Sequence, residues 1–186
     1  MAGRSDRDAV ARAMDATPRT QFLPPSVRRS ADEDRALQIG FGSTCSQPST
    51  VLSMLRFLDL QPGHRVLDVG SGSGWTTAIM ARLVGPDGSV LGVELEAPLV
   101  ERSAVALRDV PNAEVRVATK GQLGAPDAGP FDRILVSAAT SKLPESLVEQ
   151  LTPDGAMVLP LAGRLVRATR EGKEVAPGYY AFVPLR

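Results

Sequence analysis

Three alternating glycines stand where a short apolar run meets a helical pattern, and this arrangement could bind a nucleotide-type cofactor. The run at 65–69, which contains Asp68, is typical of a buried strand, and the helical pattern begins at Trp75. The residues between them are Gly70, Ser71, Gly72, Ser73 and Gly74. Because glycine lets the backbone turn sharply and approach a ligand closely, we predict a cofactor site here rather than a purely structural turn.

The spacing of the glycines narrows the class of cofactor. A dinucleotide fingerprint reads G-x-G-x-x-G, which would place its third glycine at the position of Trp75. That pattern seats a pyrophosphate on the helix N-terminus, whereas G-x-G-x-G suits a cofactor without a pyrophosphate. We therefore predict S-adenosyl-L-methionine, held by Asp68 and residues 70–74, and keep a nicotinamide-dependent oxidoreductase as an alternative.

A second candidate contact is Glu94, which ends the next apolar run and stands 24 residues after Gly70. A carboxylate at that strand end can accept hydrogen bonds from both ribose hydroxyls. We predict that Glu94 and its neighbour Leu95 bind the cofactor, the alternative being a solvated glutamate at a strand end. Glu94 would serve a methyltransferase and a dehydrogenase equally, so only the glycine spacing separates these two classes.

The loop at 39–48 places two glycines and several hydroxyls in front of a predicted helix. Taken alone, Ser46 or Ser49 is expected to cap that helix by accepting hydrogen bonds from its free N–H groups. Cys45 would then be a small apolar residue in the loop. The only histidine, His64, lies in the turn before the first strand, so a Ser-His-Asp nucleophile system is not expected.

Strands and helices that alternate along the chain would position these residues. Helices are predicted near 6–16, 49–60, 75–84, 97–108 and 144–151, and strands at 65–69, 89–94, 114–118, 131–137 and 156–161. Residues 37–43 read as an extended segment that runs into a flexible loop, and 153–155 read as the turn that ends the last helix. Residues 165–169 and 179–185 are expected to form a closing pair around the turn at 171–173. This alternation predicts an α/β fold, a doubly wound and mainly parallel sheet of the Rossmann-like type with an N-terminal helical segment.

Composition limits the class and location of the protein. The 186 residues suit one domain, with a helical and substrate-loop segment at 1–60 and a cofactor-binding core at 61–186. Lys+Arg and Asp+Glu are both 21, so the net charge of zero gives no reason to expect nucleic acid or membrane partners. One cysteine and one histidine argue against a metal site. No apolar run approaches the roughly 20 residues that are needed to span a bilayer, so no membrane-spanning segment is predicted. The single cysteine fits a reducing compartment, and we expect a cytoplasmic monomer.

Several stretches resemble the protein-L-isoaspartate O-methyltransferase family, and together they cover nearly the whole chain. The matching stretches are Met14-x-x-x-Pro18-Arg19-x-x-Phe22-x-Pro24, Ile39-Gly40-x-Gly42-x-Thr44-x-Ser46-x-Pro48, residues 66–74, 130–134 and 137–139, and Phe182-Val183-Pro184-Leu185. The glycine turn is typical of methyltransferases broadly, whereas the Thr-x-Ser-x-Pro loop is specific to this family.

The resemblance implies an enzyme that uses S-adenosyl-L-methionine to methylate the free carboxylate of abnormal L-isoaspartyl (or related aspartyl) residues in proteins or peptides. The ester then closes to a succinimide, which reopens in part as normal aspartate. In the family the serine that matches Ser46 is assigned to the active site. We expect Ser46 and Thr44 to orient the carboxylate by donating hydrogen bonds. The loop residues expected to contact the substrate are Ile39, Gly40, Gly42, Ser43 and Cys45.

Two departures from the family pattern bear on the cofactor and the acceptor. The family usually has Gly-Asp-Gly after the third strand, where its aspartate holds the adenine amino group, but this chain has Thr119-Lys120-Gly121. Lys120 and Gly121 keep the position of cofactor contacts, yet a lysine offers no acceptor, so Gln122 or backbone carbonyls must hold the adenine. The chain also stops soon after 182–185, where many relatives continue. The alternatives are therefore a carboxyl methyltransferase dedicated to one peptide and a non-catalytic protein that binds S-adenosyl-L-methionine.

Overall fold

A seven-stranded sheet forms the centre of the molecule. The structure is a computed structural model and describes residues 5–185. The strand order is β5-β4-β3-β6-β7-β8-β9. Their bounds are β3 (Arg65–Val69), β4 (Ser89–Glu94), β5 (Ala113–Val117), β6 (Phe131–Val136), β7 (Leu151–Leu161), β8 (Arg164–Ala168) and β9 (Lys173–Val175). The strands from β5 to β7 in this order run parallel, and β8 and β9 extend the sheet antiparallel. The predicted α/β fold with a mainly parallel sheet is confirmed.

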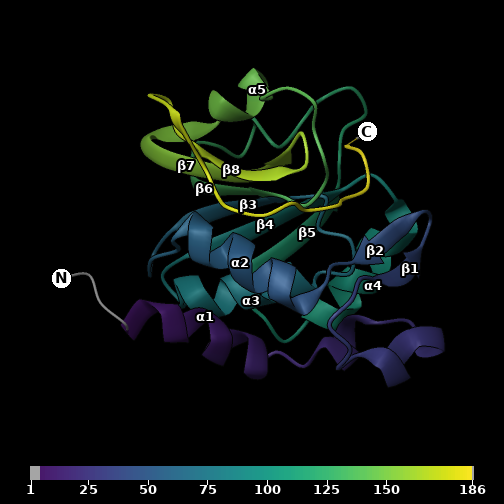
Figure 1. Ribbon diagram of the computed structural model, residues 1–186. Helices are drawn as coiled ribbons and strands as arrows, with labels where there is room; N and C mark the ends of the chain where they lie inside the picture. The colour runs from purple at the N-terminus through teal and green to yellow at the C-terminus, as the bar shows by residue number, and fades with distance from the viewer. Residues whose placement is uncertain (1–4, 186) are drawn as a thin grey trace.

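Helices cover the two faces of the sheet unequally. The longer helices are α1 (Ser5–Asp15), α2 (Pro48–Leu58), α3 (Trp75–Val84) and α4 (Ala97–Leu107). All four contribute to one buried apolar cluster, in which α1 packs on α2 and α3 while α4 packs on β4 and β5. The short α5 (Glu145–Val148) lies on the other side of the sheet and packs on β7 (Figure 1). Two 3-10 helices, η1 (Arg19–Phe22) and η2 (Pro25–Ser30), follow α1.

The central strands are apolar on both faces because both faces are buried. Val66 and Leu135 belong to the cluster that contains α1 to α4, whereas the adjacent residues Leu67 and Ile134 belong to a second cluster that contains Leu147 of α5. Successive side chains of a strand point to opposite faces, so a nearly continuous apolar run is what a doubly covered parallel sheet requires. This burial fixes where each strand ends, and hence where the following loops begin.

Residues 37–45 form a small hairpin. Its first strand agrees with the extended segment predicted from the sequence, whereas a second strand stands where a flexible loop was predicted. β1 (Leu37–Gly40) pairs antiparallel with β2 (Ser43–Cys45). Phe41 and Gly42 make the turn with φ values of 55° and 72°. The guanidinium of Arg102 on α4 donates a hydrogen bond to the carbonyl of Ile39. The hairpin is therefore fixed to α4, and it leads directly into the loop in front of α2.

The C-terminal segment follows a path that differs from the predicted one. β8 pairs with β9, which directly follows the turn at 171–173, because the shortest connection closes the hairpin. Residues 179–185 instead run beside the end of β6, where Val183 O accepts a hydrogen bond from Ala139 N at 2.8 Å and Leu185 N donates to Ala139 O at 2.9 Å. The predicted pairing of 165–169 with 179–185 is wrong. Figure 1 shows this segment, in yellow, crossing the molecule towards the side where β1 and β2 lie.

The last parallel strand begins earlier than predicted. α5 ends at Val148 and β7 already begins at Leu151, although the sequence pattern predicts a helix to 151 and a strand from 156. The register of β7 on β6 shifts between Leu151 and Ala156. The turn signal at 153–155 therefore lies at an irregularity inside the strand, where a proline need not donate to the ladder.

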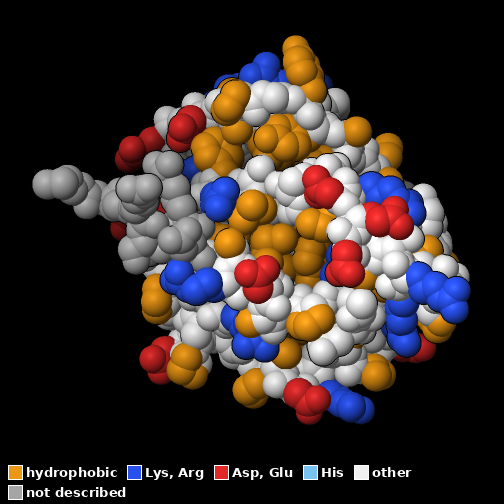
Figure 2. All heavy atoms as spheres, turned by 60° about the horizontal axis from the view of Figure 1, so that its bottom comes forward, with side chains coloured by type: hydrophobic (Ala, Val, Ile, Leu, Met, Phe, Trp, Pro, Cys, Tyr) orange, Lys and Arg blue, Asp and Glu red, His pale blue; other side chains and the backbone are white. Residues whose placement is uncertain are grey.

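The exposed face that Figure 2 shows carries acidic and basic side chains interspersed around a central group of hydrophobic ones. This mixture agrees with the equal numbers of acidic and basic residues in the sequence. Within residues 5–185, the structure contains no helix with both the length and the apolar character needed to cross a bilayer.

Candidate active site

A cavity opens at the carboxyl ends of β3, β4 and β6, and we call it the turn cavity. It is lined by residues 43–44, 69–70, 72, 93–95, 118, 122–124, 137–138 and 183–185. The strand order reverses between β3 and β6, and in open α/β sheets ligands bind beside such a point. The parallel sheet thus brings the glycine turn, the end of β4 and the C-terminal segment to one edge.

Gly70 and Gly72 shape the floor of the turn cavity. Their φ values of 77° and 53° lie in a region that other residues rarely adopt. A Cβ on Gly70 would meet no atom within 4 Å, so it would project into open space beside the turn. A Cβ on Gly72 would lie 3.3 Å from Cδ1 of Ile39, which is buried behind the turn. The glycines therefore leave room both for a ligand against the backbone and for the β1–β2 hairpin.

Glu94 presents a fixed carboxylate to the same cavity. The residue is only 7% exposed. Its Oε2 accepts a hydrogen bond from Gly72 N at 3.0 Å, and its Oε1 accepts one from Glu96 N at 3.1 Å. Each oxygen of a carboxylate has a second lone pair, so both remain able to accept a further bond. Glu94 is therefore not a solvated glutamate, and its carboxylate faces the cavity with both oxygens able to accept hydrogen bonds from a ligand.

Asp68 lies beneath the turn and does not line the cavity. It is fully buried, its Oδ2 accepts a hydrogen bond from Thr77 Oγ1 at 2.7 Å, and its Oδ1 has no hydrogen-bond partner among residues 5–185. Burial is the main reason that the pKa of Asp68 is raised to about 7; the Thr77 hydrogen bond opposes the shift, and the nearby charge of Glu94 adds to it. Asp68 thus supports the turn by joining β3 to α3.

Several other predicted cofactor contacts also lie away from the walls of the turn cavity. Ser71, Ser73 and Gly74 are buried within the turn, and a Cβ on Gly74 would stand 3.0 Å from Cβ of Ser103 on α4. These three residues pack the turn against its neighbours. Lys120 and Gly121 are exposed and do not line the cavity, whereas Gln122 does. Lys120 and Gly121, predicted as cofactor contacts, therefore lie off the cavity walls, whereas Gln122, one of the alternatives for holding the adenine, is on them.

A second depression adjoins the turn cavity, and we call it the serine groove. It is lined by residues 36, 44, 46–47, 49–50, 53, 137 and 179–183. One wall carries the hydroxyls of α2 and of the loop before it, and the other wall is the C-terminal segment. Of the predicted loop contacts, Ser46 and Thr44 line this groove, and Ser43 lines the turn cavity. Gly40 and Gly42 are exposed on the hairpin, and Cys45 is buried behind the loop.

Ser46 does not cap α2. The N-cap residue is Gln47, which makes no side-chain cap, and the free Ser49 N–H donates to Oδ1 of Asp34 at 2.9 Å. Gln47 Nε2 donates to Oδ2 of the same carboxylate at 3.0 Å. These hydrogen bonds, led by the one from the Ser49 amide, lower the pKa of Asp34. The capping alternative for Ser46 and Ser49 is wrong, and the half-buried Ser46 hydroxyl is left to the serine groove.

The turn cavity and the serine groove share three wall residues, Thr44, Ser137 and Val183. Thr44 comes from β2, Ser137 follows β6, and Val183 lies in the C-terminal segment that pairs with Ala139. A ligand in one depression would therefore meet a ligand in the other beside these residues. Such a junction suits the transfer of a group between two bound molecules.

Sequence reasoning did not identify Ser137 or the segment 183–185 as part of the site. Ser137 ends the predicted strand at 131–137 and directly follows β6, so its position beside the switch point of the sheet was a signal that could have identified it. The segment 183–185 offered no such signal, because its position depends on main-chain hydrogen bonds to Ala139.

This sheet, with a glycine turn after its first parallel strand and a buried carboxylate after its second, defines an S-adenosylmethionine-dependent methyltransferase of the Rossmann-like type. The open space beside the backbone of Gly70 and the two carboxylate oxygens of Glu94, which can accept hydrogen bonds from ribose hydroxyls, fit that cofactor. A solved protein-L-isoaspartate O-methyltransferase from Plasmodium falciparum, in complex with S-adenosyl-L-homocysteine, has the same fold. It superposes with a TM-score of 0.83 at 26% identity, over 96% of this chain and 90% of that one.

Sequence comparison identifies the family. Residues 2–177 match the family described as protein-L-isoaspartate(D-aspartate) O-methyltransferase. A protein-L-isoaspartate O-methyltransferase from Methanopyrus kandleri is 43% identical, with 98% of this chain and 84% of the relative aligned. A second, from an Anaeromyxobacter species, is 41% identical, with 96% and 85% aligned. The chain belongs to the protein-L-isoaspartate O-methyltransferase family and is an S-adenosylmethionine-dependent enzyme of that family.

Proposed function

We propose that this enzyme transfers a methyl group from S-adenosyl-L-methionine to the free carboxylate of L-isoaspartyl residues in proteins or peptides. The observation that carries the proposal is the shared wall of Thr44, Ser137 and Val183 between the turn cavity and the serine groove. The turn cavity has the features of a cofactor site, and the groove has an open side and hydroxyl groups. Membership of the family supports the isoaspartyl carboxylate as the acceptor.

The proposed cofactor contacts follow from the walls of the turn cavity. Gly70 and Gly72 would lie under the amino-acid portion, and Glu94 would accept hydrogen bonds from the ribose hydroxyls. Leu95 and Gln122 would flank the adenine, with the Gln122 side-chain oxygen supplying a hydrogen-bond acceptor that a lysine lacks. Asp68, Ser71, Ser73 and Gly74 act behind this surface by holding the turn in shape.

The acceptor would enter through the serine groove. When bound, the cofactor supplies a sulfonium methyl group; a carboxylate oxygen forms the new bond to the methyl carbon while the carbon–sulfur bond breaks and its electron pair stays on sulfur. The carboxylate needs no base, because it is already ionised at neutral pH. Ser46 and Thr44 would donate hydrogen bonds that orient it. Since strong donation would also weaken the nucleophile, we assign these hydroxyls to orientation.

The methyl ester is a better acyl donor than the free carboxylate, so the neighbouring backbone amide nitrogen can attack its carbonyl carbon, release methanol and close a succinimide. Hydrolysis of the succinimide returns part of the residue as normal aspartate, and on this basis we propose a repair role. The groove is exposed along α2, so an extended peptide segment can reach Ser46. The single methyltransferase domain, cytoplasmic location and monomeric state stay predictions.

Two measurements on the purified protein test this function. Calorimetric titration with S-adenosyl-L-methionine should show saturable binding, and incubation with an isoaspartyl peptide and labelled cofactor should give a methyl ester. Binding without transfer to any isoaspartyl or aspartyl peptide would favour the non-catalytic alternative. The absence of cofactor binding at millimolar concentration would contradict the proposal altogether.

A further inference from the structure

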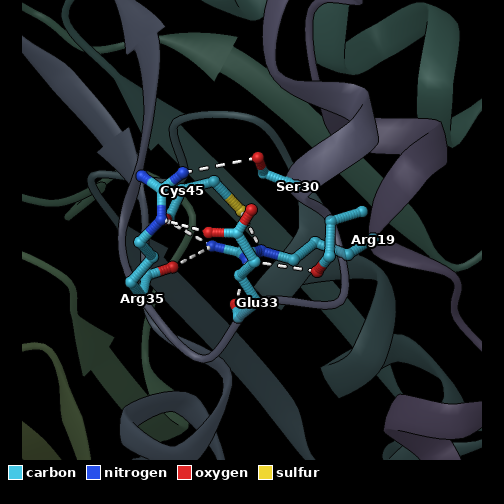
Figure 3. Close-up of polar contacts among 6 residues, drawn as sticks. Arg19, Ser30, Glu33, Arg35 and Cys45 are labelled. Carbon is cyan, nitrogen blue, oxygen red and sulfur yellow. Dashed lines mark hydrogen bonds and ion pairs between the residues drawn. The ribbon is translucent and has the colours of Figure 1, made fainter.

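Arg19 is a buried arginine whose hydrogen bonds go to residues 31–35 and to the loop residues Cys45 and Ser46. Figure 3 shows Arg19 beside Glu33, Arg35 and Cys45. It stands in η1 and is only 5% exposed. Its Nη2 donates to the carbonyl oxygens of Cys45 and Ser46, both at 2.9 Å, and its Nε donates to the Cys45 sulfur at 3.4 Å. The remaining hydrogen bonds go from Nη2 to Arg35 O at 2.9 Å, and from Nη1 to Glu33 O at 3.2 Å and Ala31 O at 3.3 Å.

This guanidinium is paired with main-chain carbonyls and not with an acid. Across the described residues 5–185, no ion pair includes Arg19; the carboxylate of Glu33 pairs with Arg35 instead. Burying a charge is unfavourable unless its donors are satisfied, and here every satisfying group belongs to the segments 31–35 and 45–46. The planar fork of an arginine fixes the direction of several carbonyls at once, which a lysine cannot do. The fork therefore specifies one backbone conformation for residues 45–46.

The same side chain also contacts the helix that follows the glycine turn. The guanidinium carbon of Arg19 lies 5.4 Å from the centre of the Trp75 ring, and Trp75 directly follows Gly74. Trp75 Nε1 donates to Thr17 O at 2.9 Å, which ties the chain just before Arg19 to α3. Arg19 thus joins the acceptor side of the site, at Ser46, to the cofactor side, at the start of α3.

We propose that Arg19 is a positioning residue, which sets the acceptor loop at the distance and angle from the glycine turn that methyl transfer needs. This inference rests on the proposed function. Transfer of a methyl group requires the attacking oxygen, the methyl carbon and the sulfur to lie in line, and small misplacements of bound reactants are costly for rate. Arg19 contacts the loop through its carbonyls, so it acts on the geometry of Ser46 and touches neither bound molecule. Binding of the cofactor should depend less on the position of residues 45–46, because Arg19 donates no hydrogen bond to the glycine turn or to Glu94 within residues 5–185. The cavity residues Ser43 and Thr44 are also held by the pairing of β2 with β1.

Two variants test the inference: Arg19→Lys, which keeps the charge but not the fork, and Arg19→Gln, which keeps a planar polar group but not the charge. Each is assayed at saturating S-adenosyl-L-methionine, because a bound ligand stabilises the folded state. We expect kcat on an isoaspartyl peptide to fall by about 100-fold in both variants. The dissociation constant of S-adenosyl-L-homocysteine should stay within about threefold, since the walls of the turn cavity are intact.

The matched control is Arg82→Met. Arg82 Nε donates to Thr17 Oγ1 at 3.1 Å, so this arginine also ties the N-terminal segment to α3, whereas the hydrogen bonds to Cys45 and Ser46 come from Arg19. The control should lower thermal stability and leave kcat per folded molecule unchanged. Chemical rescue gives a second readout in the folded variants, because added guanidinium ion at millimolar concentration should raise kcat of Arg19→Gln and not that of Arg82→Met.

The possible results distinguish a failure of the proposed function from a failure of the positioning role of Arg19. If the wild-type enzyme does not methylate the isoaspartyl peptide, the proposed function fails. If the wild type is active and either folded Arg19 variant keeps kcat within threefold, the positioning role is wrong. A parallel loss of cofactor affinity and kcat, or an equal loss of kcat in Arg82→Met, would also overturn it, because Arg19 would then act only through the stability of the fold.

Discussion

The main-chain amide of Gly72 donates a hydrogen bond of 3.0 Å to Oε2 of Glu94, so the glycine turn and the end of β4 hold each other in place. A second main-chain amide, that of Glu96, fixes Oε1 at 3.1 Å. The carboxylate is therefore preorganised before any ligand binds, and its orientation is not lost when a cofactor leaves. This one relationship links the shape of the turn to the proposed recognition of a ribose by Glu94.

Replacing Glu94 by glutamine tests that link. One oxygen would become an NH₂ group facing a main-chain N–H, and an acceptor for a hydroxyl would be lost. We expect the dissociation constant of S-adenosyl-L-homocysteine, measured by calorimetry, to rise by about 10- to 100-fold, in line with the loss of hydrogen bonds to a charged group. Glu101→Gln on the exposed side of α4 is the control and should bind normally. Equal affinity in both variants would show that Glu94 does not contact the ligand.

The adenine end of the turn cavity gives a second prediction. Gln122 lines the cavity, whereas Lys120 is exposed and lies off its walls. We expect Gln122→Ala to raise the dissociation constant of S-adenosyl-L-homocysteine by about 5- to 10-fold, the value of roughly one net hydrogen bond. Lys120→Ala should change it by less than about twofold. A larger rise in the dissociation constant for Lys120→Ala than for Gln122→Ala would show that Lys120, and not Gln122, contacts the adenine.

Ser46 provides a test of the acceptor side. Ser46→Ala should lower kcat by about 10- to 100-fold, because the carboxylate loses an orienting hydrogen bond, while cofactor affinity stays within about threefold. The melting temperature should not change, since Asp34 and not Ser46 satisfies the free amide at the start of α2. Ser26→Ala, at an exposed position in η2, controls for the loss of a hydroxyl. A melting temperature that falls while kcat per folded molecule stays normal would restore the capping role.

Much of this site could be predicted from the sequence because it depends on local order. The strand at 65–69, the glycine turn and the helix from Trp75 follow one another directly, and the pattern of apolar residues and glycines marks all three. Glu94 follows from the length of one strand–helix–strand unit. The family-specific loop placed Ser46 and Thr44, and both line the serine groove.

The features that could not be predicted depend on contacts between distant segments. Asp34 caps α2 from 15 residues away in sequence, and Arg19 binds the carbonyl of Ser46 from 27 residues away. Neither contact leaves a periodic pattern in the chain. The segment at 179–185 alternates like a strand, yet β9 already occupies the edge of β8, so the segment pairs with Ala139 instead. That choice places Val183 between the two depressions.

We expect Asp68 to lower the free energy of unfolding as the pH rises from acidic to neutral values. In the folded protein the pKa of Asp68 is about 7, above the usual value for an exposed aspartate, so the folded state binds more protons than the unfolded state at intermediate pH. Stability from this group is therefore full at acidic pH and is lost as the pH rises towards 7. Between pH 5 and pH 8 the loss amounts to about 3 kcal/mol.

Asp68→Asn should remove this dependence, because the asparagine is neutral throughout and can still accept the hydrogen bond from Thr77. Urea unfolding of both proteins at pH 5 and pH 8 measures the effect. Relative to the wild type, the variant should gain about 3 kcal/mol on going from pH 5 to pH 8. Asp109→Asn, at an exposed carboxylate, is the control. A variant with the same pH dependence as the wild type would show that Asp68 is ionised in the folded protein.

The most direct test of the proposed function is the transfer of a tritiated methyl group to two peptides of identical sequence, one with an isoaspartyl and one with an aspartyl residue. The meeting of the turn cavity and the serine groove at Thr44, Ser137 and Val183 leads us to expect a base-labile methyl ester on the isoaspartyl peptide. Ester formation on the aspartyl peptide should be at least about 100-fold slower, since misplaced reactants react poorly. Equal transfer to both peptides, or none to the isoaspartyl peptide by an enzyme that binds its cofactor, would contradict the proposed function.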